Sequence, residues 1–402
     1  PDEDRIPYGA VILDLKDGQL KVIRSRATIL ATGGYQELWA FNDAAVTACG
    51  DGLILAYEAG ARLVDLEMVQ FYPTVVIHPS AIKGTLFQYE LVIHPEFLGG
   101  RLVNGRGETF IEGMPLRDAL SRAIWNEVQM NRGTEHGGVF IDLTTSSKPR
   151  EALTAALEKW QPNQFHYLKD MGCDLREVRV EVGPHMHFAL GGVHIDEKAQ
   201  TTVPGLFACG EVAGNLHGAN RVSGNALSET QVFGARAGSA ASIFARERNT
   251  PIISDLPAHR EKAQQVLNRF QRPSPSPLRP FQIRQALQKI MWSRAGIERN
   301  ATGLQQGIAE ITDLEKHLFP RLSVACPLSY PQERVEALEV KMMILLGRLV
   351  LTSAAGRRET RGNHIRTDFP EPSPTVRHRV LEKDQELHEK AVIREDPSRW
   401  AR

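Results

Sequence analysis

The sequence predicts an α/β fold in which an α+β domain is inserted into the first domain and a helical domain follows. Apolar segments that end in glycine lie on either side of a region of mixed loops and helices, and helical patterns dominate after a proline-rich linker. At 402 residues the chain is too long for one core. We expect four parts, the first of them discontinuous: 1–75 with 184–249, then 76–183, 255–354 and the tail segment 355–402.

The composition excludes several classes of function. The 48 Lys and Arg balance 48 Asp and Glu, so a basic surface for nucleic acid is not expected. The four cysteines form no CxxC pair, and this chain alone therefore supplies neither a zinc ribbon nor an iron–sulfur cluster. So few thiols favour a reducing compartment such as the cytoplasm. No apolar run approaches the roughly 18 residues of a transmembrane helix.

The first domain begins with strand patterns. Residues 9–14 and 20–30 are apolar runs on either side of the Asp17-Gly18 turn. The second run leads into Gly33 and Gly34, which allow another group to approach the backbone closely. A helix over 51–59 and a strand over 63–71 are expected next.

The inserted domain contains one clear helical pattern, over about 116–131, with apolar residues near the helical period. A short strand is expected at Val139–Leu143. Beyond it the first domain resumes with a strand at 203–210, a glycine-rich turn at 214–224 and a helix over 226–246. Such a turn lets a helix N-terminus meet a phosphate or another electron-rich group.

The C-terminal part begins after the prolines of 273–277, which mark a linker. The patterns that follow predict helices over 281–294, 300–318 and 332–354, and a strand pair near 376–393.

Seven segments carry a resemblance to a known family: ATGG (31–34), GDG (50–52), AGARLVDLEMVQFYPT (59–74), HFALGGVHID (187–196), VPGLFACGEVAG (203–214), HGANRVSGNAL (217–227) and RGNHIRTDFP (361–370). In these the chain resembles the flavoprotein subunit of succinate dehydrogenase and fumarate reductase, a family that includes L-aspartate oxidase. The resemblance implies FAD as cofactor, a Rossmann-like flavin-binding domain, and a capping role for the inserted domain, which would close over the substrate.

One part of the family pattern is missing. The family opens with a strand, a G-x-G-x-x-G turn and a helix that bind the FAD pyrophosphate, and this chain contains no such unit. We therefore expect an incomplete flavin-binding domain, because the N-terminal, FAD-binding third of a full-length family member is missing from this chain.

The resemblance places seven residues against FAD: Gly33, Gly34, Asp51, Glu211, Asn225, Ala226 and Leu227. Two of them have plainer alternatives, since Asp51 suits a helix N-cap and Glu211 a surface acid after a strand. The N-terminus of the 226–246 helix would face the isoalloxazine ring, where its dipole favours the anionic reduced flavin. Ordinary helix packing is the alternative there.

Arg117 matches the arginine that the family uses as general acid and base, and Glu90 is the natural relay for its proton. A guanidinium is an unusual proton donor, which acts so only when it is buried near other cations. The alternative for Arg117 is a surface residue at a helix start.

Arg221 and His187 match the family residues that hold the two substrate carboxylates. A guanidinium binds a carboxylate through two parallel hydrogen bonds, although a salt bridge is the alternative for Arg221. His185, His194 and His217 lie nearby in sequence and leave a metal site as an alternative, but the family has none there.

The sequence departs from the family at Tyr72-Pro73-Thr74-Val75, where the family has His-Pro-Thr-Gly, and by an insertion at 93–95. Tyr72 would give a carboxylate one neutral hydrogen bond in place of a charged one. Tyr89 is the further candidate for substrate binding. We expect weak use of unsubstituted succinate or fumarate.

The resemblance implies an FAD-dependent oxidoreductase subunit that interconverts a succinate-type and a fumarate-type dicarboxylate. Electrons would pass to a separate iron–sulfur subunit, and membrane-anchor subunits would place the protein at the inner face of the membrane. Two alternatives stay open, an enzyme like L-aspartate oxidase and a non-catalytic assembly subunit that retains the fold.

Overall fold

The chain forms two compact units in a computed structural model that describes residues 6–248, 256–271, 274–324, 331–383 and 391–396. The larger unit consists of residues 1–40, 45–69 and 188–402, and the inserted unit of residues 41–44 and 70–187. An insertion into a discontinuous first part is thus observed, whereas the four expected domain ranges stay predictions.

The inserted unit is built on a four-stranded sheet. Its strands, in spatial order, are β5 (Val69–His78), β8 (Val180–Ala189), β7 (Val139–Asp142) and β6 (Arg101–Val103). Its helices are α2 (Tyr89–Ile93), α3 (Arg117–Gln129), α4 (Arg150–Trp160) and α5 (Pro162–Asp170). The helix expected over 116–131 and the strand expected at 139–143 are confirmed. The α3 helix begins at Arg117, directly after the extended Leu116.

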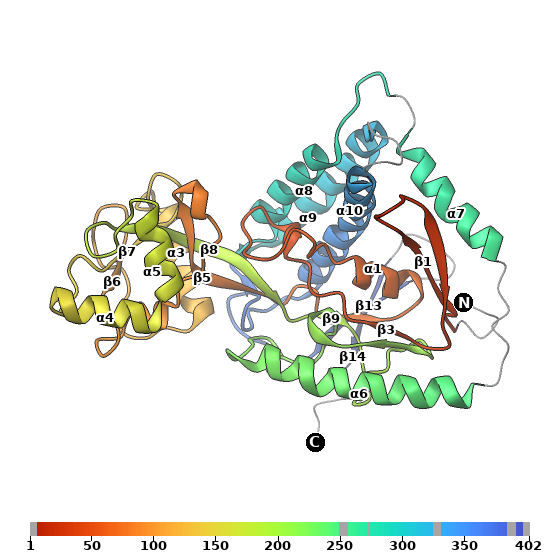
Figure 1. Cartoon of the computed structure of the whole chain (residues 1–402), viewed down its shortest axis with the longest axis horizontal. Helices are drawn as coiled ribbons and strands as arrows, with labels where there is room; N and C mark the ends of the chain where they lie inside the picture. Colours follow the sequence, from red (N-terminus) through yellow and green to blue (C-terminus); the bar gives the residue numbers. More distant parts are fainter. Residues whose placement is uncertain (1–5, 249–255, 272–273, 325–330, 384–390, 397–402) are drawn as a thin grey trace. The chain divides into compact units, whose positions relative to one another are not determined.

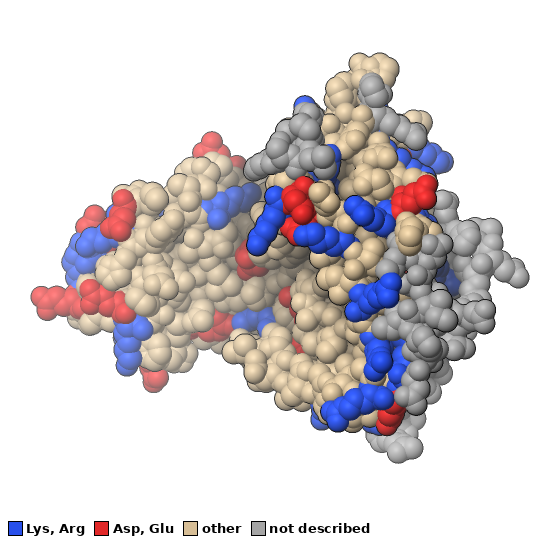
Figure 2. Space-filling model, turned by 45° about the vertical axis from the view of Figure 1, so that its right-hand side comes forward, with Lys and Arg blue, Asp and Glu red and all other residues tan. Residues whose placement is uncertain are grey.

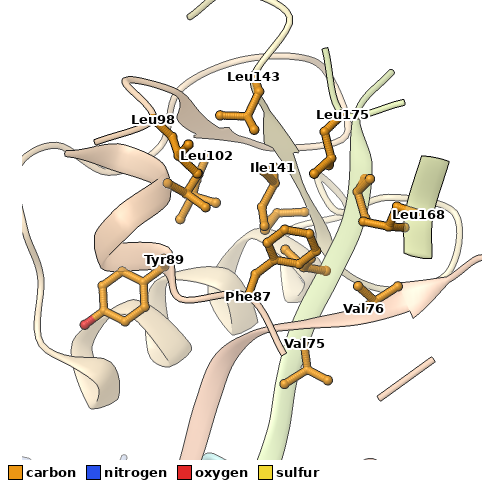
Figure 3. Packing of buried hydrophobic residues seen from close by; sticks show 14 of the residues in the cluster. Val75, Val76, Phe87, Tyr89, Leu98, Leu102, Ile141, Leu143, Leu168 and Leu175 are labelled. Atoms are coloured by element: carbon orange, nitrogen blue, oxygen red, sulfur yellow. The ribbon is translucent and has the colours of Figure 1, made fainter. Parts of the chain in front are cut away.

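The core of the inserted unit joins this sheet to its helices (Figure 3). Val75 and Phe87 are fully buried, as are Ile141 and Leu168 from β7 and α5. Burying each such side chain contributes about 1.5–3 kcal/mol. Because β5 is buried on both faces up to Ile77, any polar side chain on it must find its partner inside the unit.

The larger unit contains several small sheets. They comprise the antiparallel pair β1 (Gly9–Leu13) and β2 (Leu20–Arg24), the parallel pair β3 (Thr28–Leu30) and β10 (Leu206–Ala208), the parallel pair β11 (Glu298–Arg299) and β12 (Ile365–Arg366), and the sheet β14 (Ala391–Asp396), β13 (His378–Lys383), β4 (Leu63–Val64) and β9 (Gly192–Val193). The strand pair expected near 376–393 is confirmed.

Three strand predictions were wrong in their extent, and the strand expected at 203–210 is limited to β10, which has three residues. The run 20–30 is not one strand, because β2 pairs with β1 whereas β3 pairs with β10, and the chain bends between them. At the bend the Ser25 and Thr28 hydroxyls lie 3.0 Å apart in a hydrogen bond. The run 63–71 is likewise divided, because β4 ends at Val64 and β5 begins at Val69.

The helices of the larger unit are α1 (Asp51–Glu58), α6 (Asn225–Glu247), α7 (Leu256–Arg269), α8 (Pro280–Arg294), α9 (Ala301–Asp313) and α10 (Gln332–Gly356). Figure 1 shows α8, α9 and α10 side by side, and they contact one another directly. The helical C-terminal part is thus confirmed, with a π-helical turn at Leu314–Leu318 continuing α9. Short 3₁₀ turns lie at Gln36–Leu38, Ser80–Ile82, Gly210–Val212 and Phe319–Arg321.

A network of buried charges ties the end of α10 to the segment before β5. Arg357 is 3% exposed and donates to Glu67 at 2.5 Å, to Asp65 at 2.8 Å and to Glu359 at 2.8 Å. Burial alone would lower the pKa of Arg357, but Glu67 and Asp65 outweigh it and raise the pKa. This arginine is therefore held as a permanent cation with a structural role.

The network continues through β11 and β12. Arg299 donates to the backbone oxygen of Glu67 at 2.8 Å and to His364 Nδ1 at 2.9 Å. Since an arginine can only donate, His364 accepts at Nδ1 and carries its proton on Nε2, which donates to the Arg357 oxygen at 3.3 Å. Burial, with Arg299 and Arg357 beside it, holds the pKa of His364 well below its ordinary value.

Candidate active site

A cluster in the inserted unit joins three of the predicted residues. Arg117 is the first residue of α3, Glu90 lies in the first turn of α2, and Tyr72 lies in the middle of β5. Arg117 Nη2 lies 3.8 Å from Glu90 Oε1, and the Tyr72 hydroxyl donates to Glu90 Oε2 at 3.3 Å. Glu90 therefore has a different partner at each carboxylate oxygen.

The Tyr72 ring lies beneath the Arg117 guanidinium, whose central carbon is 4.7 Å from the ring centre. Tyr72 is 1% exposed, and burial, assisted by Glu90, raises the pKa of its hydroxyl far above the ordinary range. The Arg117 side chain is only 14% exposed, whereas Glu90 is 37% exposed. These surroundings contradict the alternative that Arg117 is a surface residue at a helix start.

Tyr89 adjoins the same cluster, with its ring 6.2 Å from that of Tyr72. Its hydroxyl donates to the Pro115 backbone oxygen at 2.8 Å, and burial raises the pKa of Tyr89 to about 12. The hydroxyl therefore stays protonated and braces the loop that leads into Arg117.

His187 lies near the same cluster, with its ring 5.2 Å from that of Tyr72. Its Nδ1 is 2.8 Å from Asp43 Oδ2, and the Asp43 side chain is 6% exposed. A carboxylate that accepts from Nδ1 fixes the orientation of the imidazole ring. The sequence reasoning missed Asp43, because the residue lies 144 positions from His187 and belongs to none of the family motifs.

Arg221, in the larger unit, is 8% exposed and lies over the Phe188 ring at 4.1 Å. The loop before it is held by Asn363, which donates from its backbone to Ala219 at 2.9 Å and from its side chain to Asn220 at 3.1 Å. The motifs around residues 217–221 and 361–364 are thereby joined. The sequence predicted both motifs but not this contact.

His217 lies beside Phe188, and its Nε2 is buried with no hydrogen-bond partner among the described residues. Burial, followed by the charge of Arg221, lowers the pKa of His217. A neutral imidazole nitrogen that is buried without a partner is available to a bound group.

The four histidines do not form a metal centre in the described part of the chain, where no three His, Cys, Asp or Glu side chains are grouped to hold an ion. His185 is fully buried and shares a hydrogen bond of 3.1 Å with the Gly183 oxygen. Burial lowers the pKa of His185 to about 4, so the ring is neutral.

Glu211 is held at the end of β8 by two donors. The Gln36 side chain and the Ala189 backbone nitrogen each donate to Glu211 Oε1 at 2.7 Å. A Cβ on Gly34 would lie 2.5 Å from that oxygen, so a larger residue there would displace the Glu211 carboxylate. Glu211 is thus held in place beside Gly34. This contradicts the alternative that Glu211 is a surface acid.

Asp51 is the first residue of α1, and the N-cap is Gly50 with a φ of 73°, so the N-cap role considered for Asp51 is wrong. A Cβ on Gly52 would lie 2.0 Å from Thr32 Oγ1, which shows that the start of α1 packs against the glycine segment. At Gly33, with a φ of 78°, a Cβ would meet nothing within 4 Å. The two motifs therefore adjoin and leave open space at Gly33.

The first turn of α6 follows Gly224, which has a φ of 88°, and holds Asn225, Ala226 and Leu227. Leu227 is 72% exposed, an unusual exposure for a leucine on a helix of 23 residues. The positive end of the helix dipole and an exposed apolar side chain suit an electron-rich aromatic ring system. These features, the open space at Gly33 and the unpartnered His217 nitrogen fit a flavin.

Sequence profiles of two families match the chain. The FAD binding domain family matches residues 3–227, and the family of the C-terminal region of the fumarate reductase flavoprotein matches residues 284–399. The expectation of a flavin-binding domain with FAD as cofactor is confirmed. The match begins at residue 3, and the expectation of a missing N-terminal third stays a prediction.

Three similar proteins illustrate the relationship. A component of the fumarate reductase (CoM/CoB) from Methanothermobacter marburgensis is 36% identical over 94% of this chain and 68% of its own length. An L-aspartate oxidase from Ralstonia nicotianae is 32% identical over 90% of this chain and 61% of its own length. The structure of Mycobacterium smegmatis Sdh1 in complex with UQ1 has a TM-score of 0.87 at 29% identity and covers 98% of this chain and 65% of that one.

The chain therefore spans about two thirds of the length of these relatives, between 61% and 68%. Among the described residues, no helix combines the length and apolar character needed to cross a membrane. Basic and acidic side chains both occur on the face shown in Figure 2, separated by large areas of other residues.

Proposed function

Because the chain belongs to the family of FAD-dependent oxidoreductases that contains the flavoproteins of succinate dehydrogenase and fumarate reductase and also L-aspartate oxidase, we propose that it interconverts a succinate-type and a fumarate-type dicarboxylate. The observation that carries the proposal is the contact of Arg117 with Glu90 over the buried Tyr72. Such an arginine, with a partly exposed carboxylate beside it, is arranged to move a proton.

In this proposal Arg117 gives a proton to a substrate carbon, or takes one from it, and Glu90 exchanges that proton with solvent. Glu90 suits the relay because it is 37% exposed and lies 3.8 Å from the guanidinium. FAD, when bound, supplies the hydride chemistry at the neighbouring carbon. Gly33, Gly34, Asp51, Glu211 and the first turn of α6 would hold it.

His187 and Arg221 would bind the substrate carboxylates. Asp43 fixes the orientation of the His187 ring through Nδ1, and in this proposal Nε2 donates to a carboxylate oxygen of the substrate. Arg221 offers a planar guanidinium that Phe188 supports from one side, the geometry that suits a two-point contact with a carboxylate. Tyr89 is the further substrate-binding candidate from the sequence.

A separate iron–sulfur subunit would exchange electrons with this chain, because the Methanothermobacter relative is itself one component of a fumarate reductase built from more than one chain. Membrane-anchor subunits at the inner face of the membrane belong to the same proposal. They are tested by identifying the proteins that copurify with the native chain.

An enzyme like L-aspartate oxidase is the second candidate, favoured by the relative at 32% identity. A non-catalytic assembly subunit is the third, and it would keep the fold without the chemistry. Anaerobic mixing of the purified flavoprotein with succinate or L-aspartate, followed by absorption spectroscopy, separates the three. Bleaching by succinate supports the proposal, bleaching by aspartate alone favours the oxidase, and a protein without flavin favours the assembly subunit.

The proposal is tested most directly by Arg117→Gln with Arg122→Gln as matched control. Arg122 lies on the same helix and is exposed. We expect both variants to retain FAD and only Arg117→Gln to lose turnover. Equal activity in the two variants would assign the proton transfer to another group.

A further inference from the structure

We propose that Tyr72 is a positioning residue, which holds the Glu90 carboxylate beside the Arg117 guanidinium and does not bind the substrate itself. This inference rests on the proposed function. It differs from the expectation that the Tyr72 hydroxyl replaces a carboxylate-binding histidine. The contacts of this one side chain carry it.

The hydroxyl of Tyr72 has a single proton to donate, and Glu90 Oε2 accepts it at 3.3 Å. A substrate carboxylate would have to displace Glu90 to receive that proton. The other oxygen, Glu90 Oε1, lies 3.8 Å from Arg117 Nη2. The hydroxyl thus orients the carboxylate by the oxygen that does not face Arg117, and leaves the facing oxygen for proton exchange.

The ring of Tyr72 contributes a second constraint. The Arg117 guanidinium lies over its face at 4.7 Å, a distance at which a cation is attracted to an aromatic ring. Tyr72 itself is 1% exposed, with the rings of His187 and Tyr89 at 5.2 Å and 6.2 Å. Because the ring is enclosed, it offers the substrate no open surface and acts through the residues around it.

Burial keeps the hydroxyl protonated, because it raises the pKa of Tyr72 far above the ordinary value. The charged and titratable groups around it are Glu90, Arg117 and Tyr89, together with His187 and its partner Asp43. A phenol that stays protonated in this setting is a constant donor to Glu90.

The test is a cycle of three variants in the full flavin-containing protein: Tyr72→Phe, Glu90→Gln and the double variant. Fumarate reduction is measured with a reduced viologen dye as electron donor. Tyr72→Phe keeps the ring under Arg117 and removes only the hydroxyl. We expect kcat to fall about tenfold, the loss typical of a hydrogen bond to a charged group, while KM stays close to its original value.

The double variant gives the sharper result. If Tyr72 acts through Glu90, removing the hydroxyl from Glu90→Gln has no further effect on kcat. If Tyr72 binds the substrate directly, KM rises in both backgrounds by the same factor, and that result overturns the inference. A tenfold loss in kcat that recurs unchanged in Glu90→Gln also overturns it.

Thr74→Val is the matched control, because Thr74 lies on the same buried strand and its hydroxyl donates to the Phe87 oxygen at 2.6 Å. It removes a buried hydroxyl that does not reach Glu90, and we expect lower stability with unchanged kcat. An equal loss of kcat in Thr74→Val would show that the loss in Tyr72→Phe comes from disturbed packing of the strand, and this would overturn the inference. A wild-type flavoprotein that neither reduces fumarate nor is bleached by succinate overturns the proposed function first, and this role with it.

Discussion

Arg117 in the inserted unit and Arg357 in the larger unit both face carboxylates, but their surroundings differ. Arg357 is 3% exposed and contacts Glu67 and Asp65 at 2.5 and 2.8 Å, with Glu67 fully buried. Arg117 is 14% exposed and lies 3.8 Å from Glu90, which is 37% exposed. The short, buried contacts of Arg357 suit a structural role, whereas the proton transfer proposed for Arg117 needs the longer contact beside solvent. Residue type alone does not separate the two roles.

The largest effect that tests this contrast is a loss of stability at Arg357. Arg357→Gln removes the cation that contacts Glu67, Asp65 and Glu359, and breaking a buried ion pair from one side costs about 3–5 kcal/mol. Urea unfolding followed by circular dichroism measures it. Arg348→Gln is the control on the helix that precedes Arg357, because Arg348 pairs with the partly exposed Glu315 and its loss costs at most about 1 kcal/mol. A similar loss of unfolding free energy in both variants would show that the buried Arg357 matters no more for stability than a partly exposed arginine.

The second effect concerns turnover at Arg117. Arg117→Gln is expected to lower kcat about 100-fold or more, as for a lost general acid, while unfolding free energy falls by less than about 1 kcal/mol. Arg117→Lys should restore little, because an ammonium lacks the planar guanidinium shape. Steady-state kinetics and urea unfolding on the same preparations check the prediction. A large loss of stability with modest loss of turnover would make Arg117 a structural residue like Arg357.

The third effect is the acid sensitivity of the Arg357 network. His364 has a lowered pKa in the folded protein, so below about pH 6.5 the unfolded chain binds a proton that the folded chain does not. Stability is therefore expected to fall with decreasing pH by up to about 1.4 kcal/mol per pH unit. His185 adds to the loss between about pH 6.5 and its folded pKa of about 4.

Urea unfolding between pH 7.5 and 5 measures this slope. In His364→Gln the slope should be smaller by up to one proton, and an unchanged slope would show that His364 does not control the acid response.

The smallest expected effect is a change in KM at Asn363, which connects the segment of the Arg357 network to the loop of Arg221. Asn363 belongs to the segment next to His364, and it also holds the loop that carries Arg221. Asn363→Ala loses the side-chain hydrogen bonds at about 1 kcal/mol each, so KM for the dicarboxylate should rise about fivefold with little change in kcat. Asn300→Ala is the control, because Asn300 caps α9 through Gly303 at 2.8 Å and should affect stability alone. An unchanged KM in Asn363→Ala would separate this segment from substrate binding.

Much of the fold was predictable, because local patterns control local structure. The periodicity around Leu120 and Ile124 predicted α3 within two residues at either end, and the glycine-rich turn predicted the start of α6 within one. Predictions failed where pairing decides the outcome. The run 20–30 has uniform strand character, yet its two halves pair with different partners, which no local propensity reports.

The sequence by itself determined the family, the flavin-binding character and the type of each candidate group, because motifs are contiguous and keep their order along the chain. Only the tertiary structure decided which group meets which. His187 and Asp43 are 144 residues apart, and Arg357 and Glu67 are 290 apart. A hydrogen bond depends on a separation of about 3 Å and on direction, and both are set by packing rather than by sequence spacing. For that reason the sequence named Tyr72 and Glu90 separately, and the fold made them partners.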